Sequence, residues 1–162
     1  MTITAIRKDL EACTMTVTAE FDSPVDRVWQ VWADPRQLER WWGPPMWPAT
    51  FTEHSLQVGA VCRYHMTGPE GEASNGWWQI RQVDAPVYLE LDDGFADADG
   101  NRNAEMPTMV MRVSLAPRAT GGTRMSIETT FPSAEALVSL VEMGMEEGLS
   151  AAMGQLDDIL AE

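Results

Sequence analysis

The chain lacks the features of membrane, secreted and nucleic-acid-binding proteins. It has no run of about twenty apolar residues, and residues 1–10 contain no apolar stretch of the kind found in secretory signals. Basic residues are few, with 11 Lys and Arg against 25 Asp and Glu, which gives a formal net charge of −14. This acidity argues against binding to nucleic acid or to an anionic membrane surface. We expect a soluble, cytoplasmic protein.

Patterns typical of metal sites and catalytic centres are also missing. Cys13 and Cys62 lie far apart without CxxC spacing, so neither a disulfide framework nor a zinc site is indicated. His54 and His65 fall on different predicted strands, without HxxxH or HExxH spacing, and we interpret both as surface residues. No GxSxG motif or phosphate-binding glycine loop is present. We therefore predict no catalytic residues, no metal ligands and no cofactor.

The order of the predicted elements indicates one domain, residues 1–162, with its core over residues 14–160. Alternating apolar and polar residues, typical of half-buried strands, occur at residues 14–21, 50–54, 58–66, 76–83, 87–91, 108–115 and 123–131. Two short helices, residues 25–34 and 35–41, follow the first strand, because Ser23 and Pro24 form a helix-start signal. The sequence DDG at residues 92–94 is interpreted as the start of an acidic loop.

Residues 133–162 have the apolar spacing of one long amphipathic helix. Gly144, Gly148 and Ala152 share one face of it at four-residue spacing, although each interior glycine costs about 1 kcal/mol relative to alanine. Two interpretations stay open. The small residues serve close packing on a sheet or mark a local break near Gly144, or they leave a groove that a ligand fills.

Together these elements predict an α+β fold. Strands joined by short turns pair antiparallel, and a sheet with one apolar face needs a cover. The C-terminal helix is the one predicted element long enough for this. We expect a curved antiparallel sheet of about six to seven strands wrapped on that helix.

Several short motifs resemble a known family in the same order along the chain. FDSPVDRVW at residues 21–29, ADP at residues 33–35 and LERWWGP at residues 38–44 resemble the opening of START-like (SRPBCC) domains. With GGTRM at residues 121–125 and GMEEGL at residues 144–149, they are similar to the branch named for the C-terminal domain of the activator of heat-shock protein 90 ATPase. The chain departs from that pattern at Ala60, where glycine is usual, and at Leu149, where tryptophan is frequent. The resemblance implies a helix-grip fold with a cavity between helix and sheet.

Methionine and tryptophan are candidates for the walls of that cavity, because methionine adapts its shape and tryptophan supplies a rigid face with one polar group. Simple core filling is the alternative interpretation. With the small helix face, the candidate cavity residues are Trp42, Tyr64, Met66, Trp78, Met109, Met111, Met125, Gly144, Met145, Gly148 and Ala152.

Two pairs of adjacent tryptophans, at residues 41–42 and 77–78, raise the question of exposure. Neighbours on a strand point to opposite faces, and neighbours on a helix cannot both face inward. In the 41–42 pair we therefore expect one tryptophan in the core and the other either covering the mouth of the cavity or exposed. In the 77–78 pair, an exposed tryptophan would suit contact with a partner or a second copy of the chain.

Three functions are compatible with the sequence. We favour a small-molecule-binding protein that holds a hydrophobic or aromatic ligand in the cavity. The family name suggests a chaperone-associated domain, and a cyclase-like or hydratase-like enzyme could use the same cavity. The expected partner is a hydrophobic small molecule, with a chaperone and a homodimer as the other partners considered.

Charged residues also lie on the predicted strands. We expect them to form ion pairs on the solvent face, unless one of them points inward. The residues considered are Arg63, Arg81, Glu90, Arg112, Arg124 and Glu128.

Overall fold

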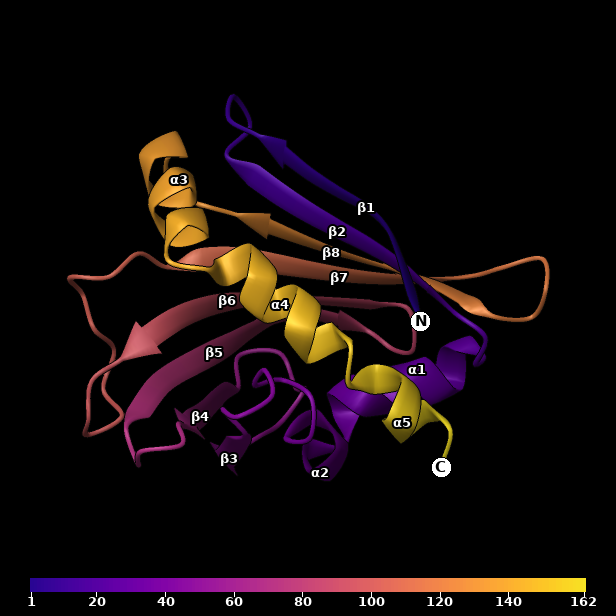
Figure 1. Ribbon diagram of the computed structural model, residues 1–162, viewed down its shortest axis with the longest axis horizontal. Coiled ribbons are helices and arrows are strands. Elements are labelled where there is room, and N and C mark those ends of the chain that lie inside the picture. Colours follow the sequence, from indigo (N-terminus) through magenta and orange to yellow (C-terminus); the bar gives the residue numbers. More distant parts are fainter.

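A computed structural model of the protein, which describes residues 1–162, shows one curved antiparallel sheet crossed on one face by the C-terminal helices (Figure 1). The strands are β1 (Thr2–Asp9), β2 (Thr14–Phe21), β3 (Ala49–Glu53), β4 (Val61–Thr67), β5 (Ala73–Asp84), β6 (Tyr88–Ala96), β7 (Met109–Pro117) and β8 (Thr123–Thr130). The helices are α1 (Val25–Ala33), α2 (Pro35–Leu38), α3 (Ala134–Glu142), α4 (Met145–Met153) and α5 (Leu156–Leu160). The predicted α+β helix-grip fold is confirmed. No helix is both long enough and apolar enough to cross a membrane.

The strand order brings distant parts of the chain side by side. The sheet runs β1-β2-β8-β7-β6-β5-β4-β3. The chain therefore crosses from β2, near one edge, to β3 at the opposite edge, and α1 and α2 lie on this crossing (Figure 1). β2 pairs with β8 from Thr14 opposite Thr130 to Phe21 opposite Thr123.

The sheet has eight strands, slightly more than the six to seven expected, because it starts earlier in the chain. β1 pairs with β2 from Thr2 opposite Glu20 to Asp9 opposite Thr14. It forms one edge of the sheet, and most of its residues are exposed. An exposed edge strand needs no continuous apolar face, so its sequence gives little alternation to detect.

The apolar side of the sheet packs in two separate clusters. The larger one has 26 buried residues and joins the sheet to α1, α2, α5 and the end of α4. Its aromatic centre includes Trp42, whose ring lies edge-on to Trp78 with centroids 5.0 Å apart. The smaller cluster holds α3 and consists of Met15, Met109, Phe131, Leu137 and Leu140.

Neither tryptophan of the 41–42 pair is exposed, so of the two placements considered for the outer one, exposure is wrong. Trp41 is 0% exposed and Trp42 is 9% exposed, and both belong to the larger cluster. α2 ends before them, so helical geometry no longer places adjacent side chains on different faces. The indole N–H of Trp41 donates to the carbonyl oxygen of Val31 at 2.9 Å.

The same expectation is wrong for the 77–78 pair. Trp77 and Trp78 do point to opposite faces of β5, yet Trp77 is only 4% exposed. The guanidinium of Arg102 stacks on its ring at 3.9 Å from the centroid, and its indole N–H donates to the carbonyl oxygen of Phe95 at 3.1 Å. Neither pair therefore offers an exposed tryptophan to a partner.

The C-terminal segment is broken into three helices instead of forming one long helix. Gly144 has a φ of 99°, in the left-handed region, and follows Met143, the residue that caps the end of α3. Its N–H donates to the carbonyl oxygen of Val141 at 3.0 Å, which closes the last turn. Glycine is the usual residue at such a helix end, because other residues adopt this conformation at a cost of about 1–2 kcal/mol. Of the interpretations left open for the glycines, the structure shows the local break near Gly144, and a second interruption precedes α5.

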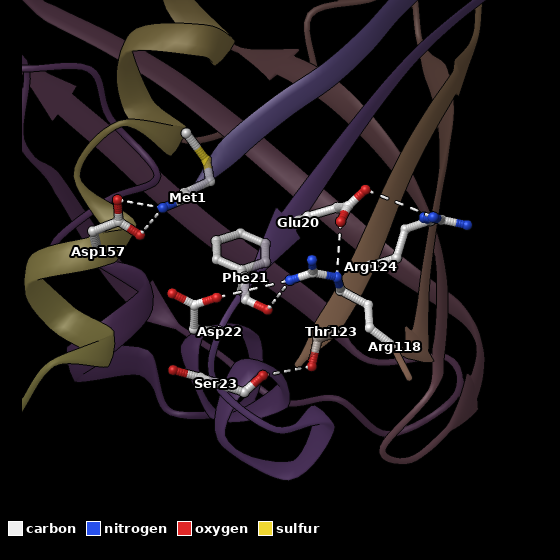
Figure 2. Close-up of polar contacts among 9 residues, drawn as sticks. All are labelled: Met1, Glu20, Phe21, Asp22, Ser23, Arg118, Thr123, Arg124 and Asp157. Carbon is white, nitrogen blue, oxygen red and sulfur yellow. Dashed lines mark hydrogen bonds and ion pairs between the residues drawn. The ribbon is translucent and has the colours of Figure 1, made fainter. Parts of the chain in front are cut away.

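Polar contacts join the end of β2 to the connection between β7 and β8 (Figure 2). Arg118 donates to the carbonyl oxygen of Phe21 at 3.1 Å and forms an ion pair with Glu20 at 2.7 Å. The hydroxyl of Thr123 donates to the carbonyl oxygen of Ser23 at 2.8 Å. These contacts fix the point where the chain leaves β2 for α1.

Two glycine substitutions should change stability in opposite directions. Gly144→Ala should destabilise the protein by about 1 kcal/mol, since alanine is strained at positive φ. Gly148→Ala should stabilise it by about 0.5–1 kcal/mol, because it lies inside α4 and an added Cβ meets no atom within 4 Å. Urea unfolding of both variants and the parent measures the difference. A shift of the same sign for both would contradict this account of the helix break.

Candidate functional site

A cavity of about 420 Å³ lies between the sheet and the break in the C-terminal helices. Its volume is in the range of small-molecule sites, which is about 300–1,000 Å³. Of its 16 lining residues, 10 are hydrophobic. The lining consists of Trp42, Pro44, Trp47, Met66, Ser74, Asp93, Phe95, Met109, Met111, Thr129, Leu140, Met143, Gly144, Met145, Gly148 and Leu149.

The cavity occupies the space where the two hydrophobic clusters do not meet. Trp42 and Met111 on its wall belong to the larger cluster, whereas Met109 and Leu140 belong to the smaller one. α4 crosses this space without a side chain at Gly148, where an added Cβ would meet no atom within 4 Å. Close packing therefore does not explain Gly148.

Most of the candidate cavity residues line this space. Those on the wall are Trp42, Met66, Met109, Met111, Gly144, Met145 and Gly148. Met125 and Ala152 do not line it; both are buried in the larger cluster. Met125 lies further along the sheet, opposite Ala19 of β2, and Ala152 lies one turn beyond Gly148 on α4. Met125 and Ala152 point inward, as predicted. Which part of the core each side chain reaches depends on where the helices cross the sheet.

The other two candidates, Tyr64 and Trp78, lie behind the wall and contact Asp93, which does line the cavity. Asp93 lies on β6, opposite Trp78 in the register with β5. The hydroxyl of Tyr64 donates to Oδ1 of Asp93 at 3.3 Å. Asp93 is the one ionisable side chain among the lining residues.

Asp93 is half-buried, and its surroundings disfavour its charge. Burial raises the pKa of this carboxyl from 3.8 to about 7, while the Tyr64 hydroxyl and the nearby Trp78 indole N–H lower that pKa only in part. Burial and the neighbouring carboxyl also raise the pKa of Tyr64 well above its usual value. The indole N–H groups of Trp42 and Trp78 are buried and reach no acceptor with hydrogen-bond geometry. The Tyr64 hydroxyl is the one side-chain group that donates to Asp93 with hydrogen-bond geometry, so the carboxyl keeps further acceptor capacity.

Asp93 was not among the predicted site residues, because DDG at residues 92–94 has the composition of a turn. In the structure β6 continues through it to residue 96. Gly94 serves another purpose, since a Cβ there would lie 2.5 Å from the ring of Trp77. The alternation of the strand did indicate that Asp93 points inward, because residues 89, 91, 93 and 95 share one face of β6.

The charged strand residues considered for the site form ion pairs instead, as predicted. Pairs connect Arg63 with Glu53, Arg81 with Asp92, Arg112 with Glu90 and Glu128, and Arg124 with Glu20.

The two histidines differ from the surface residues expected. His54 is half-buried, its Nε2 lies 3.2 Å from the carbonyl oxygen of Trp32, and burial lowers its pKa. His65 is half-buried on the strand face opposite Tyr64. No group of three or more His, Cys, Asp or Glu side chains is arranged to hold a metal ion.

Asp93→Asn should change how stability depends on pH. Because the folded-state pKa of about 7 exceeds 3.8, the native state retains this proton at pH values where the unfolded chain has lost it. Wild-type stability should therefore fall relative to the variant, by up to about 1.4 kcal/mol per pH unit, between about pH 4 and about pH 7. Urea unfolding across this range measures it. Asp92→Asn, on the outer face, is the control and should show no such relative gain; a pH-independent difference for Asp93→Asn would contradict the assignment.

The chain is similar to known proteins over nearly its whole length. The family model described as Activator of Hsp90 ATPase homolog 1-like protein matches residues 22–161. No curated protein matches the chain. A crystal structure of a protein from Mycobacterium smegmatis has 45% identity and a TM-score of 0.90, covering 98% of this chain and 97% of that one.

Two further solved structures agree with this match. A protein from Arthrobacter aurescens has 49% identity and a TM-score of 0.94, covering 99% of this chain and 92% of that one. The AHSA1 protein from Silicibacter pomeroyi, at 20% identity and a TM-score of 0.72, covers 91% of this chain and 97% of that one and shares the fold. The chain therefore belongs to the family of activator of Hsp90 ATPase homolog 1-like proteins, as its motifs indicated.

Proposed function

We propose that the protein binds one small, predominantly hydrophobic or aromatic molecule in the cavity beneath the junction of α3 and α4. The observation that carries this proposal is the open space at Gly148 inside a largely apolar cavity of about 420 Å³. Protein interiors are normally close-packed, and the atoms around a void lose their dispersion contacts. A bound apolar molecule restores those contacts.

The composition of the wall supports a ligand of adaptable shape. Five methionines contribute to it, and their flexible thioethers adjust to different apolar surfaces; they are Met66, Met109, Met111, Met143 and Met145. Trp42, Trp47 and Phe95 add flat aromatic surfaces. These residue types favour a ligand that combines an aromatic ring with an aliphatic part.

The cavity also has a route to solvent. Met143 lines it and is 66% exposed, and Ser74 lines it and is exposed as well. A ligand can therefore enter beside the break at Gly144 without opening of the main sheet. The chaperone-associated and cyclase-like functions stay predictions from the family resemblance.

Filling the cavity from α4 should weaken ligand binding strongly. In Gly148→Met the new side chain occupies the open space, so we expect the neutral apolar dye N-phenylnaphthylamine to bind at least about tenfold more weakly than to the parent. Ala151→Met adds the same side chain to an exposed position of the same helix and should leave binding unchanged. Dye fluorescence titration measures the affinities, and circular dichroism checks that both variants fold.

Native mass spectrometry of the freshly purified 18.0 kDa chain gives an independent test of the same proposal. We expect a fraction of the protein to carry a molecule of defined mass that is released on denaturation, and this fraction should disappear in Gly148→Met. If the parent carries no molecule and the dye binds all three proteins equally, the cavity is not a binding site.

A further inference from the structure

The charges around the cavity indicate the chemical class of its ligand, an inference that rests on the proposed function. We propose that the cavity selects hydrophobic molecules that carry a protonated amine over carboxylates and neutral molecules of the same skeleton, and that Asp93 is the group that binds the cation.

The first argument is the charge inventory of the wall. None of its 16 residues is Lys, Arg or His, and one, Asp93, is acidic. A buried charge is tolerated when an opposite charge pairs with it and is strongly disfavoured otherwise. A ligand carboxylate would enter a cavity that offers it no cation and a second carboxylate. A ligand ammonium would find its counter-ion on the wall.

The second argument is the unfilled acceptor capacity of Asp93. A carboxylate has about four lone-pair positions for hydrogen bonds, and Tyr64 donates to Oδ1 at 3.3 Å. On its own strand, Asp92 points to the outer face and pairs with Arg81 at 2.7 Å, so that arginine does not compensate the charge of Asp93. An ammonium donates up to three hydrogen bonds, and charge-assisted bonds of this kind are about twice as strong as neutral ones.

The third argument is the set of aromatic and sulfur-containing side chains beside Asp93. Trp42, Trp47 and Phe95 share the cavity wall with it. The faces of aromatic rings carry partial negative charge and attract cations, most strongly where water is excluded. The same rings and the methionines contact the hydrophobic part of the ligand, so one wall suits both halves of a lipophilic amine.

Binding of such a cation should be coupled to release of a proton. Burial raises the pKa of Asp93 to about 7, so part of the protein carries a protonated carboxyl at neutral pH. The titratable group that faces Asp93 is Tyr64 from β4, and its raised pKa keeps it protonated. β5 presents Trp78, β7 presents Met109 and α4 presents Gly148, none of which titrates. A bound ammonium favours the ionised carboxylate and displaces its proton.

The experiment compares three probes with one skeleton: naphthylmethylamine, naphthylmethanol and naphthoic acid. Isothermal titration calorimetry at neutral pH should show the amine binding about tenfold to a hundredfold more tightly than the alcohol, and the acid more weakly than the alcohol. Asp93→Asn should remove the preference for the amine and retain binding of the alcohol. Asp92→Asn on the outer face is the matched control and should behave like the parent.

A second readout uses the unmodified protein and does not depend on the folding of any variant. Titrations in buffers of different ionisation enthalpy should show that the amine releases a fraction of a proton on binding, and affinity for the amine should rise from about pH 6 to about pH 8. The alcohol should show neither effect.

The outcomes separate this inference from the proposed function. If the alcohol or the acid binds to the parent as tightly as the amine, or if the amine preference survives in Asp93→Asn, the charge selectivity is refuted and the cavity remains a binding site. If none of the three probes and no neutral dye binds, the proposed function fails and the inference fails with it.

Discussion

The apolar face of an eight-stranded sheet is wider than one helix can cover, and this mismatch governs the structure. An α-helix with its side chains is about 10–12 Å across, while neighbouring strands lie about 4.7–4.9 Å apart, so a single helix covers two or three strands. The chain covers one part of the sheet with α1, α2 and α5 and another with α3, which gives two separate clusters. α4 connects these two parts, and the space beneath it remains open at Gly148.

Asp93 differs from most other charged strand residues because it forms no ion pair. Elsewhere on the strands, carboxylates and guanidinium groups pair across neighbouring strands, as Arg112 does with Glu90 and Glu128. Asp93 faces apolar surroundings with one hydroxyl as its hydrogen-bond donor, an arrangement that costs stability when the group is ionised. Positions where a sequence breaks its own structural rules are frequently functional, because the loss in stability is tolerated for the sake of binding or chemistry.

The features that depend on local periodicity or on family motifs could be predicted from the sequence. The features that depend on contacts between distant parts of the chain could not. Alternation identified the strands whose inner face is buried, and the motifs identified the family. β1 was missed because most residues of this edge strand are exposed. The helical spacing of apolar residues continues across Gly144, so periodicity alone did not locate the break. Met111 and Met125 both point inward on adjacent strands, and only the path of the helices determines that Met111 reaches the cavity.

The pairing of β2 with β8 also constrains how the chain folds while it is being synthesised. The hydrogen bond between Thr123 and Ser23, at the end of this pair, joins residues 100 positions apart. The hairpin of β1 and β2 leaves the ribosome before the other strands of the sheet, but β2 lacks its second neighbour until β8 follows. Contacts over such long separations form slowly, and an unpaired strand edge is a template for pairing with other chains. The interval between synthesis of β2 and of β8 is therefore the period in which the nascent chain is most exposed to aggregation.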